Sequence, residues 1–274
     1  IPTFDALRYS TSTITFWVSY IAFFISILFF VNKKEIVYVR EAPLLALSIF
    51  GFRVIYECHA IPKYRALFFW LCRRARHVIV ISNALKRTFV ENGFDEKKVL
   101  VAPSGVDLNI FQTEISKEEA RKKLALPLDA KILVYTGNFT TMGEDKGIGD
   151  ILKALKNLPE VLFVAVGGSD KDRARYEKQA RALDILNRTK LFGFASQTTL
   201  ALYQRAADIL LMPFPDTPHY RNHMSPVKMF EYMASGRPII ATDLPTICEV
   251  LNEKNAIIIP PGDINALAAA VEKL

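Results

Sequence analysis

The stretch from His223 to Thr242 reads His-Met-Ser-Pro-Val-Lys-Met-Phe-Glu-Tyr-Met-Ala-Ser-Gly-Arg-Pro-Ile-Ile-Ala-Thr and predicts a short polar loop, a helix and a buried strand. Pro226 suits a first helical turn, where the missing N–H would have no partner, and Ser225 before it is a good N-cap. Gly236 sits where a left-handed residue would close the helix, and the apolar run after it predicts a strand. This succession indicates an α/β fold.

Two charged side chains give this helix a possible chemistry. Lys228 lies at its start, and Glu231 lies further along, near the first full turn. Backbone dipoles and an ammonium at a helix N-terminus can hold phosphates, while a carboxylate can accept hydrogen bonds from sugar hydroxyls. On spacing alone, the simpler interpretation is favoured, namely a helix packed beside a parallel strand with Glu231 in solvent.

The same alternation of strands and helices extends in both directions. Strand-like apolar runs cover 36–40, 53–57, 77–81 and 98–102, and then 131–136, 161–166, 190–194, 208–213, 238–242 and 257–259. Helical patterns separate most of them, including 62–74, 117–124, 170–186, 198–206 and 264–274. Strands connected through helices of this length predict parallel sheets with crossover connections.

Composition narrows the function classes. The chain has 274 residues, 51% of them hydrophobic, and can bury one large core or two moderate ones. Three widely spaced cysteines predict neither a disulfide framework nor a zinc site, and they indicate a reducing cytoplasm. Residues 1–107 carry 14 Lys and Arg against 8 Asp and Glu, whereas residues 108–274 carry 21 against 20. This imbalance predicts an anionic partner for the first part, either a membrane surface or a phosphorylated acceptor, and no nucleic-acid motif accompanies it.

The uncharged run from residue 14 to residue 31 has three interpretations. Its length meets the lower limit for a transmembrane helix, but its Ser and Thr residues favour a buried helix of an α/β domain. The third interpretation is a surface helix whose aromatic face dips into a bilayer. The helix expected over 62–74 mixes arginines with Leu67, Phe68 and Trp70, so it too could lie against anionic lipid or against the core.

The segment from Ser225 to Thr242 resembles the nucleotide-sugar motif of retaining glycosyltransferases of family 4. That resemblance implies the GT-B fold, in which two Rossmann-like α/β domains with parallel sheets face each other across a cleft. Ser104-Gly-Val-Asp107 resembles the end of the family's N-terminal domain. We therefore expect an acceptor-side domain over 1–107 and a nucleotide-sugar-binding domain over 108–274. Both ends of the chain look cut, so we expect the N-terminal domain to be incomplete.

The resemblance also implies roles for individual residues. The family motif has two glutamates separated by seven residues, of which the second matches Glu231 and holds the ribose. The position of the first, which contacts the donor sugar, is occupied by His223. The rest of the motif adds Ser225, Pro226, Val227 and Lys228 to the expected donor site.

Further donor contacts are expected on other loops. Lys146 matches the family's phosphate-binding lysine, and Asn138 stands where the family often has an arginine. Phe194 belongs to a Phe-Gly-Phe turn that matches the one meeting the nucleobase. His59 corresponds to a histidine that faces the donor sugar, and it has Glu57 as a neighbour. His59 and Glu231 are the catalytic candidates. For both phenylalanines and for a histidine at a strand end, a purely structural role is the alternative.

The resemblance implies transfer of a sugar, with retention, from a nucleoside diphosphate to a hydroxyl of a saccharide or lipid-linked acceptor. Cell-surface polysaccharide or glycolipid synthesis, in the cytoplasm or at the inner face of the membrane, is the expected setting. We expect neither a metal nor another cofactor, because Asp170 and Asp172 open a helix instead of forming a metal loop. The alternatives are a nucleotide-sugar epimerase of the same architecture and a non-catalytic relative that binds nucleotide sugar.

Overall fold

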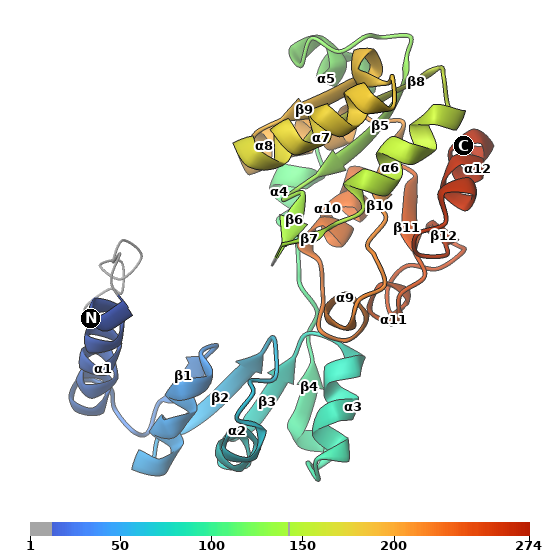
Figure 1. The fold of residues 1–274 in the computed structure, drawn as a ribbon. Coiled ribbons are helices and arrows are strands. Elements are labelled where there is room, and N and C mark those ends of the chain that lie inside the picture. The colour runs from blue at the N-terminus through green and yellow to red at the C-terminus, as the bar shows by residue number, and fades with distance from the viewer. Residues whose placement is uncertain (1–12, 142) are drawn as a thin grey trace. The chain divides into compact units, whose positions relative to one another are not determined.

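The computed structural model describes residues 13–141 and 143–274, and the chain forms two compact units (Figure 1). The first unit ends at Ala102 and the second begins at Pro103, a few residues before the boundary predicted from the sequence. Each unit is built around a parallel sheet of its own. The two units are described separately below.

The first unit has a four-stranded parallel sheet in the order β1-β2-β3-β4. Its strands are β1 (Ile36–Val39), β2 (Arg53–Cys58), β3 (His77–Val80) and β4 (Val99–Val101). Its helices are α1 (Thr13–Phe30), η2 (Ala42–Phe50), α2 (Arg65–Cys72), α3 (Asn83–Glu91) and η3 (Glu96–Lys98). The expected strands and the helix expected over 62–74 are confirmed, and η2 was not predicted.

Helix α1 is only half covered. Tyr20 and Ile27 enter the core of the first unit, while Ile21, Phe29 and Phe30 are exposed. The interpretation of this run as a buried helix of an α/β domain therefore holds for one side of α1 only, the side that packs on η2 and the core of this unit. Within the described part of the chain, we find no helix whose length and apolar character would let it span a membrane.

The second unit has a six-stranded sheet in the order β12-β11-β10-β5-β8-β9, again parallel throughout. Its strands are β5 (Lys131–Thr136), β8 (Val161–Val166), β9 (Thr189–Phe192), β10 (Ile209–Met212), β11 (Ile239–Thr242) and β12 (Ile257–Ile259). A two-stranded hairpin, β6 (Thr140–Thr141) with β7 (Glu144–Asp145), lies in the loop after β5 and was not predicted.

Helices connect these strands. They are α4 (Leu108–Phe111), α5 (Lys117–Lys123), α6 (Ile148–Ala154), η4 (Leu155–Asn157), α7 (Asp170–Ala182), η5 (Leu186–Arg188), α8 (Gln197–Ala206), α9 (Pro218–Asn222), α10 (Val227–Ser235), α11 (Pro245–Cys248) and α12 (Ile264–Lys273). The sequence predicted the longer helices of this set and missed the short helices α4, α9 and α11, which contain about one turn each.

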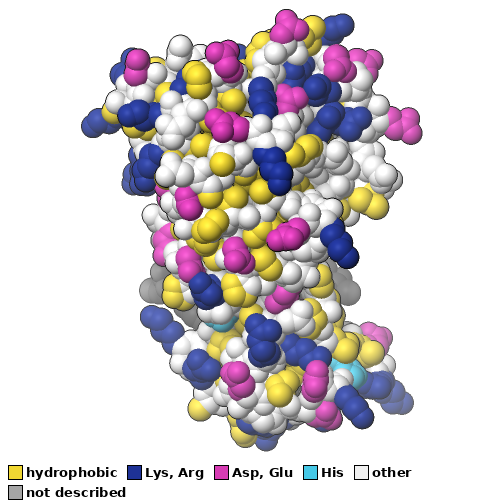
Figure 2. Space-filling view, turned by 90° about the vertical axis from the view of Figure 1, so that its right-hand side faces the viewer, with side chains coloured by type: hydrophobic (Ala, Val, Ile, Leu, Met, Phe, Trp, Pro, Cys, Tyr) yellow, Lys and Arg dark blue, Asp and Glu magenta, His cyan; other side chains and the backbone are white. Residues whose placement is uncertain are grey.

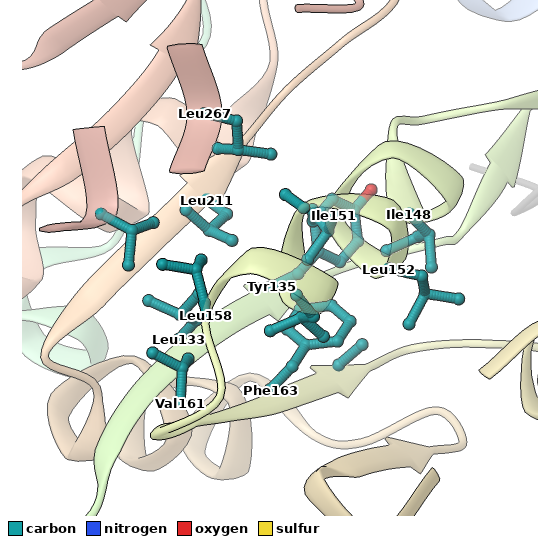
Figure 3. Close-up of a cluster of buried hydrophobic side chains, with 14 of the residues drawn as sticks. Leu133, Tyr135, Ile148, Ile151, Leu152, Leu158, Val161, Phe163, Leu211 and Leu267 are labelled. Carbon is teal, nitrogen blue, oxygen red and sulfur yellow. The ribbon is translucent and has the colours of Figure 1, made fainter. Parts of the chain in front are cut away.

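Strand β5 shows why both faces of this sheet must be covered. Leu133 and Tyr135 point into one apolar layer with residues of α6 and α12, as Figure 3 shows. Ile132 and Val134 point into the opposite layer, which includes Tyr232 of α10. Successive side chains of a strand alternate between its faces, so an all-apolar strand needs helices on both sides.

The strand order reverses at β5, which has β8 on one side and β10 on the other. In open α/β sheets, connections on the two sides of such a point diverge and leave a crevice beyond the carboxyl ends of the strands. The loops after β5, β8 and β10 are therefore the place to look for a ligand site.

The ends of α10 confirm one sequence prediction and correct another. Gly236 closes the helix with a φ of 67° in the left-handed region, as expected. Ser225, however, is not the N-cap, because Pro226 has an extended conformation and the helix begins at Val227. The Ser225 hydroxyl accepts a hydrogen bond from the Ser104 N–H at 2.8 Å, and Ser104 Oγ donates to the Ser225 carbonyl at 2.7 Å.

The surface of the second unit carries both signs of charge. In the view of Figure 2, acidic and basic side chains are interspersed over its surface. That mixture agrees with the near balance of charges counted over residues 108–274. A positive site in this unit must therefore come from the local placement of a few side chains.

Candidate functional site

Glycines bring the loops at the carboxyl edge of the sheet into close contact. A Cβ on Gly167, after β8, would lie 2.6 Å from the carbonyl oxygen of Gly137, after β5. A Cβ on Gly147 would lie 1.9 Å from the carbonyl oxygen of Pro213, after β10. All three glycines have φ between 95° and 118°, which side-chain-bearing residues rarely adopt. The three loops thus approach at backbone distance.

Lys228 lies beside the first of these loops. Its side chain comes from the first turn of α10, and only 9% of the residue is exposed. The ammonium nitrogen lies 3.5 Å from the centre of the Tyr135 ring, and a Cβ on Gly137 would lie 3.3 Å from it. No described residue accepts a hydrogen bond from this nitrogen. A buried cation without an acceptor costs free energy of folding, so this position is typical of a side chain that binds an anionic ligand.

The electrostatics of Lys228 reflect that placement. Burial holds the pKa of its ammonium well below the ordinary value, and repulsion from Lys146 lowers the pKa further. Attraction to Glu231 acts in the opposite direction. Burial also lowers the pKa of Lys146, which is half-buried on the loop between β7 and α6. An anion bound near both ammonium groups would relieve their repulsion.

The two helix N-termini near this site differ. The Asp145 carboxylate accepts hydrogen bonds from the N–H groups of Gly147, Ile148 and Gly149 at 2.7–3.0 Å, so the protein itself occupies the start of α6. At the start of α10, no side chain of residues 13–141 or 143–274 caps the helix. Its first N–H groups stand next to Lys228, and together they form a cationic end of the site.

Glu231 supplies the acidic end. It lies one turn into α10 with 8% of its surface exposed, and Gln204 Nε2 donates to its Oε2 at 3.1 Å. Burial raises the pKa of the Glu231 carboxyl, while the hydrogen bond from Gln204 and the charge of Lys228 oppose that rise. The structure therefore places a carboxylate within electrostatic reach of the Lys228 ammonium, which suits a ligand with both phosphates and hydroxyls.

Gln204 was missed by the sequence analysis. It lies on α8, is fully buried, and also donates from Nε2 to Thr136 Oγ1 at 3.1 Å. Thr136 in turn contacts the Tyr232 hydroxyl through its N–H at 2.9 Å. A glutamine on the inward face of an amphipathic helix is the one signal in the sequence that could have indicated it.

Among the predicted donor residues, Lys146 and Glu231 both act electrostatically on Lys228. Asn138 is exposed, and its carbonyl oxygen accepts from the Tyr135 hydroxyl at 2.9 Å. Phe194 follows β9 with 72% of its surface exposed, so it is not part of the core.

The remaining motif residues surround the start of α10. His223 is half-buried at the end of α9, where its N–H donates to the His219 carbonyl at 2.9 Å. Pro226 is half-buried, and Val227 is exposed. No described contact decides the predicted donor-sugar role of His223, which stays a prediction.

His59 belongs to the first unit and follows β2. Its Nε2 lies 2.6 Å from Glu57 Oε1 and 2.9 Å from Arg40 Nη2, and the Tyr38 hydroxyl donates to Glu57 Oε2 at 2.5 Å. Burial would raise the pKa of Glu57, but the hydrogen bonds from Tyr38 and His59 and the charge of Arg40 bring it below its ordinary value. The predicted neighbour Glu57 is thus a direct partner of His59.

Metal binding has no obvious location in the described part of the chain, where no group of three or more His, Cys, Asp and Glu side chains is placed to hold an ion. The expectation that the protein works without metal or cofactor stays a prediction.

Solved structures share this architecture. The structure of Anabaena Alr3699/HepE in complex with UDP and glucose matches 92% of this chain with a TM-score of 0.74 and 19% identity, over 71% of that chain. Sucrose-phosphate synthase from Thermosynechococcus elongatus matches 100% of this chain with a TM-score of 0.76 and 22% identity, over 70% of that chain. The predicted GT-B fold with two Rossmann-like units is confirmed.

Sequence relatives agree with the fold. The putative teichuronic acid biosynthesis glycosyltransferase TuaC of Bacillus subtilis is 28% identical over 201 residues, which are 72% of this chain and 46% of that protein. This chain thus spans about half the length of the curated relatives that it matches. A family model described as Glycosyltransferase Family 4 matches residues 21–110. The model described as Glycosyl transferases group 1 matches residues 116–274, more than half of the chain, and the protein therefore belongs to that family.

Proposed function

We propose that this protein is a retaining glycosyltransferase that transfers a sugar from a nucleoside diphosphate sugar to an acceptor hydroxyl, and that its second unit binds the donor. The observation that carries the proposal is the Lys228 ammonium, which is buried next to Gly137 at the carboxyl edge of the sheet and has no acceptor among the described residues. A diphosphate at that edge would supply the missing acceptor oxygens. Lys146 and the uncapped start of α10 lie on the same side of the site.

The transfer places its charge where these groups lie. As the bond between the anomeric carbon and the diphosphate breaks, negative charge grows on the leaving diphosphate. Lys228, Lys146 and the α10 N–H groups stabilise that charge in a partly buried environment, where fixed charges act more strongly than in water. The acceptor oxygen bonds to the same carbon on the same face, and its proton leaves with the diphosphate. The two lysines would provide positive charge at the position where other transferases use a metal ion.

Glu231 takes the ribose in this proposal. Its carboxylate lies on the same helix as Lys228, so one helix meets both the phosphates and the sugar of the nucleotide. The exposed ring of Phe194 is free to pack against a base, and Asn138 and His223 complete the expected donor contacts. His59, held by Glu57, is proposed as the group of the first unit that faces the donor sugar.

The relatives suggest which donor and setting to test first. Alr3699/HepE was solved with UDP and glucose, and TuaC is named for teichuronic acid biosynthesis. We therefore propose a UDP-linked hexose as the donor and a saccharide or lipid-linked saccharide of a cell-surface polymer as the acceptor. A cytoplasmic location at the inner face of the membrane is part of the same proposal.

A binding screen followed by product analysis tests the proposal. Thermal shift with UDP, ADP, GDP and their sugars should show stabilisation by one nucleoside diphosphate and its sugar, and clearly less by the nucleoside alone. Incubation of the sugar nucleotide with a saccharide acceptor should release the diphosphate and give a product of unchanged anomeric configuration. An altered free nucleotide sugar without transfer would identify an epimerase. Binding without turnover would leave a non-catalytic binding protein.

The first unit offers a surface for the membrane. Trp70 and Leu67 of α2 are exposed, and the guanidinium of Arg74 stacks on Trp70 with 3.5 Å between its Cζ and the ring centre. An aromatic side chain flanked by arginines is typical of a helix at the interface of an anionic bilayer. Such a contact would bring the protein to a lipid-linked acceptor.

A further inference from the structure

Glu231 is held from one side only. Gln204 Nε2 donates to Oε2 of its carboxylate, and none of the described residues donates to Oε1. The carboxylate is nearly buried, so each of its oxygens needs a donor for the charged form to persist. One oxygen has a donor within the protein and the other is left for a ligand.

The amide of Gln204 can adopt only one orientation that suits this carboxylate. Its nitrogen has two hydrogens, and they are directed to Glu231 Oε2 and Thr136 Oγ1, each at 3.1 Å. In the reversed orientation, Gln204 Oε1 would face Oε2 of Glu231, and two acceptors would oppose each other unless the carboxyl were protonated. The hydroxyl of Thr136, which also lies 3.3 Å from the Tyr232 hydroxyl, completes the support.

This orientation of the Gln204 amide leaves a buried oxygen without a hydrogen bond to any described residue, and packing does not explain why such an unfavourable group is present. Gln204 Oε1 is buried and has no hydrogen-bond partner among the described residues. An apolar side chain of the same size would fill the space between α8, α10 and β5 without leaving an acceptor unpaired. The glutamine is therefore better explained by what its amide nitrogen does for Glu231.

We propose that Gln204 is a positioning residue, which holds Oε2 of Glu231 and thereby directs Oε1 to the ribose diol of the bound nucleotide. This inference rests on the proposed function, because it assigns the ribose to Glu231. Lys228 and Tyr232 are the titratable groups that interact electrostatically with the Glu231 carboxylate, and neither of them donates a hydrogen bond to it. Among the described residues, Gln204 alone donates a hydrogen bond to it.

The test compares nucleotides that differ only in the diol. Dissociation constants are measured by calorimetry for UDP and 2′,3′-dideoxy-UDP, or for the ADP or GDP pair if that diphosphate gives the larger thermal shift. Wild-type protein should prefer the ribonucleotide. Gln204→Met should reduce that preference about tenfold, as expected for loss of an oriented charge-assisted hydrogen bond. The dissociation constant of the dideoxy nucleotide should stay within about twofold of the wild-type value.

Two variants separate this inference from the proposed function. Glu231→Gln should lose the preference for the ribonucleotide. Lys228→Met should weaken the binding of both nucleotides equally and keep the preference. If Glu231→Gln loses the preference and Gln204→Met keeps it, Gln204 does not position Glu231, although the function stands. If Glu231→Gln keeps the preference, or if no diphosphate binds, the ribose assignment falls and the inference falls with it.

Gln204→Glu gives a readout that a merely structural residue would not produce. Gln204 Nε2 and Glu231 Oε2 are 3.1 Å apart, so a carboxyl group in place of the amide should share one proton with Glu231 and donate to it as the amide does. The preference for the ribonucleotide should therefore be kept at low pH and lost as the pH rises through the raised pKa of the pair. The phosphate groups titrate alike in both nucleotides, so their effect cancels in the ratio. A preference in Gln204→Glu that does not change with pH would overturn the inference.

Discussion

The ammonium nitrogen of Lys228 lies 3.5 Å from the centre of the Tyr135 ring. The ring face attracts a cation, but it offers less than an anionic acceptor does. Tyr135 is the last large apolar residue of β5 before the loop at Gly137, so this contact places the ammonium at the carboxyl edge of the sheet. In the free protein, the Lys228 ammonium therefore lies without an acceptor among the described residues, at the place where the donor diphosphate is proposed to bind.

The first prediction is that Lys228→Met weakens the binding of a nucleoside diphosphate and raises the free energy of unfolding of the free protein. Loss of the ammonium should weaken the binding of a nucleoside diphosphate by about 10- to 100-fold, the scale of a hydrogen bond to a charged group. The affinity for the nucleoside should not change. The free protein should gain about 1 kcal/mol, because a buried unpaired charge is removed. Calorimetry and urea unfolding measure the two effects. Equal losses for the nucleoside and its diphosphate would mean that Lys228 acts through folding instead.

The pH dependence of stability gives the same group a second test. The folded protein holds the pKa of Lys228 well below its ordinary value of 10.5, so above that depressed pKa the unfolded chain binds more protons. Stability therefore rises with pH between the depressed pKa and 10.5. The stability gain of Lys228→Met over wild type should shrink across this window. A gain that is constant with pH would show that the lysine stays charged in the folded protein.

The second prediction concerns Glu231→Gln. The substitution should weaken the nucleotide sugar by about 1–3 kcal/mol, since a charge-assisted hydrogen bond to the ribose becomes a neutral one. Burial raises the pKa of the Glu231 carboxyl, so the folded protein should not lose stability when the charge is removed. Titration calorimetry and a melting curve test both statements. An unchanged affinity would refute the ribose assignment.

The third prediction uses two glycines as a matched pair. Gly147 and Gly262 both have positive φ, but a Cβ on Gly147 would lie 1.9 Å from the Pro213 carbonyl oxygen, whereas a Cβ on Gly262 would meet nothing within 4 Å. Gly147→Ala should therefore destabilise the protein by clearly more than Gly262→Ala, whose cost is backbone strain of about 1 kcal/mol. It should also weaken the nucleoside diphosphate, because the loop that carries Lys146 must move. Similar unfolding free energies for the two variants would contradict the close approach.

The fourth prediction concerns the amino ends of the strands in the second unit, on the side of the sheet away from Lys228. There the side chain of Arg121 is buried. Its Nη2 lies 2.6 Å from Asp208 Oδ2, and that oxygen also accepts from the Ile132 N–H at 2.7 Å. Asp208→Asn should cost about 3–5 kcal/mol, since the buried guanidinium loses its counter-charge. Lys117→Met removes the more exposed partner of Asp208 and should cost less than about 1 kcal/mol.

The acid limb of the stability curve tests the same pair. Burial would raise the pKa of Asp208, but the hydrogen bonds from Ile132, Lys117 and Arg121 bring it below the ordinary value of 3.8. Its contribution is complete above pH 3.8 and is lost as the pH falls through the lowered pKa. The difference between wild type and Asp208→Asn should thus narrow in acid. Donor binding should be the same in both proteins at neutral pH.

The fifth prediction is that binding to vesicles needs anionic lipid and weakens as salt rises. Trp70→Ser should reduce the bound fraction in sedimentation assays, because its exposed ring is proposed to enter the interface. Lys153→Ser, in the second unit, is a control that removes an exposed cation and should leave the bound fraction unchanged. Binding that ignores salt would point to insertion of α1 instead, and no binding would assign the positive charge to a soluble acceptor.

Local rules were enough for most of the architecture. The apolar runs at 131–136 and 161–166 became β5 and β8 with the expected bounds, since a strand buried on both faces has a nearly continuous apolar sequence. Gly236 closes α10 because few other residues adopt a left-handed conformation without strain. The loop chemistry was harder. Ser225 bonds to Ser104, 121 positions away in the chain, and no local pattern reveals such a partner.

The sequence by itself determined the parallel α/β units, the helix that carries Lys228 and Glu231, and the family resemblance, because these depend on periodicity and on residues close together in the chain. Only the tertiary structure decided that Lys228 is buried with no acceptor in the described part of the chain, and that Gln204 of α8 donates to the carboxylate of Glu231. Burial and hydrogen-bond pairing depend on which segments pack together, and the order of the strands sets that packing. The strand order, which reverses at β5, therefore turned three separate loops into one site.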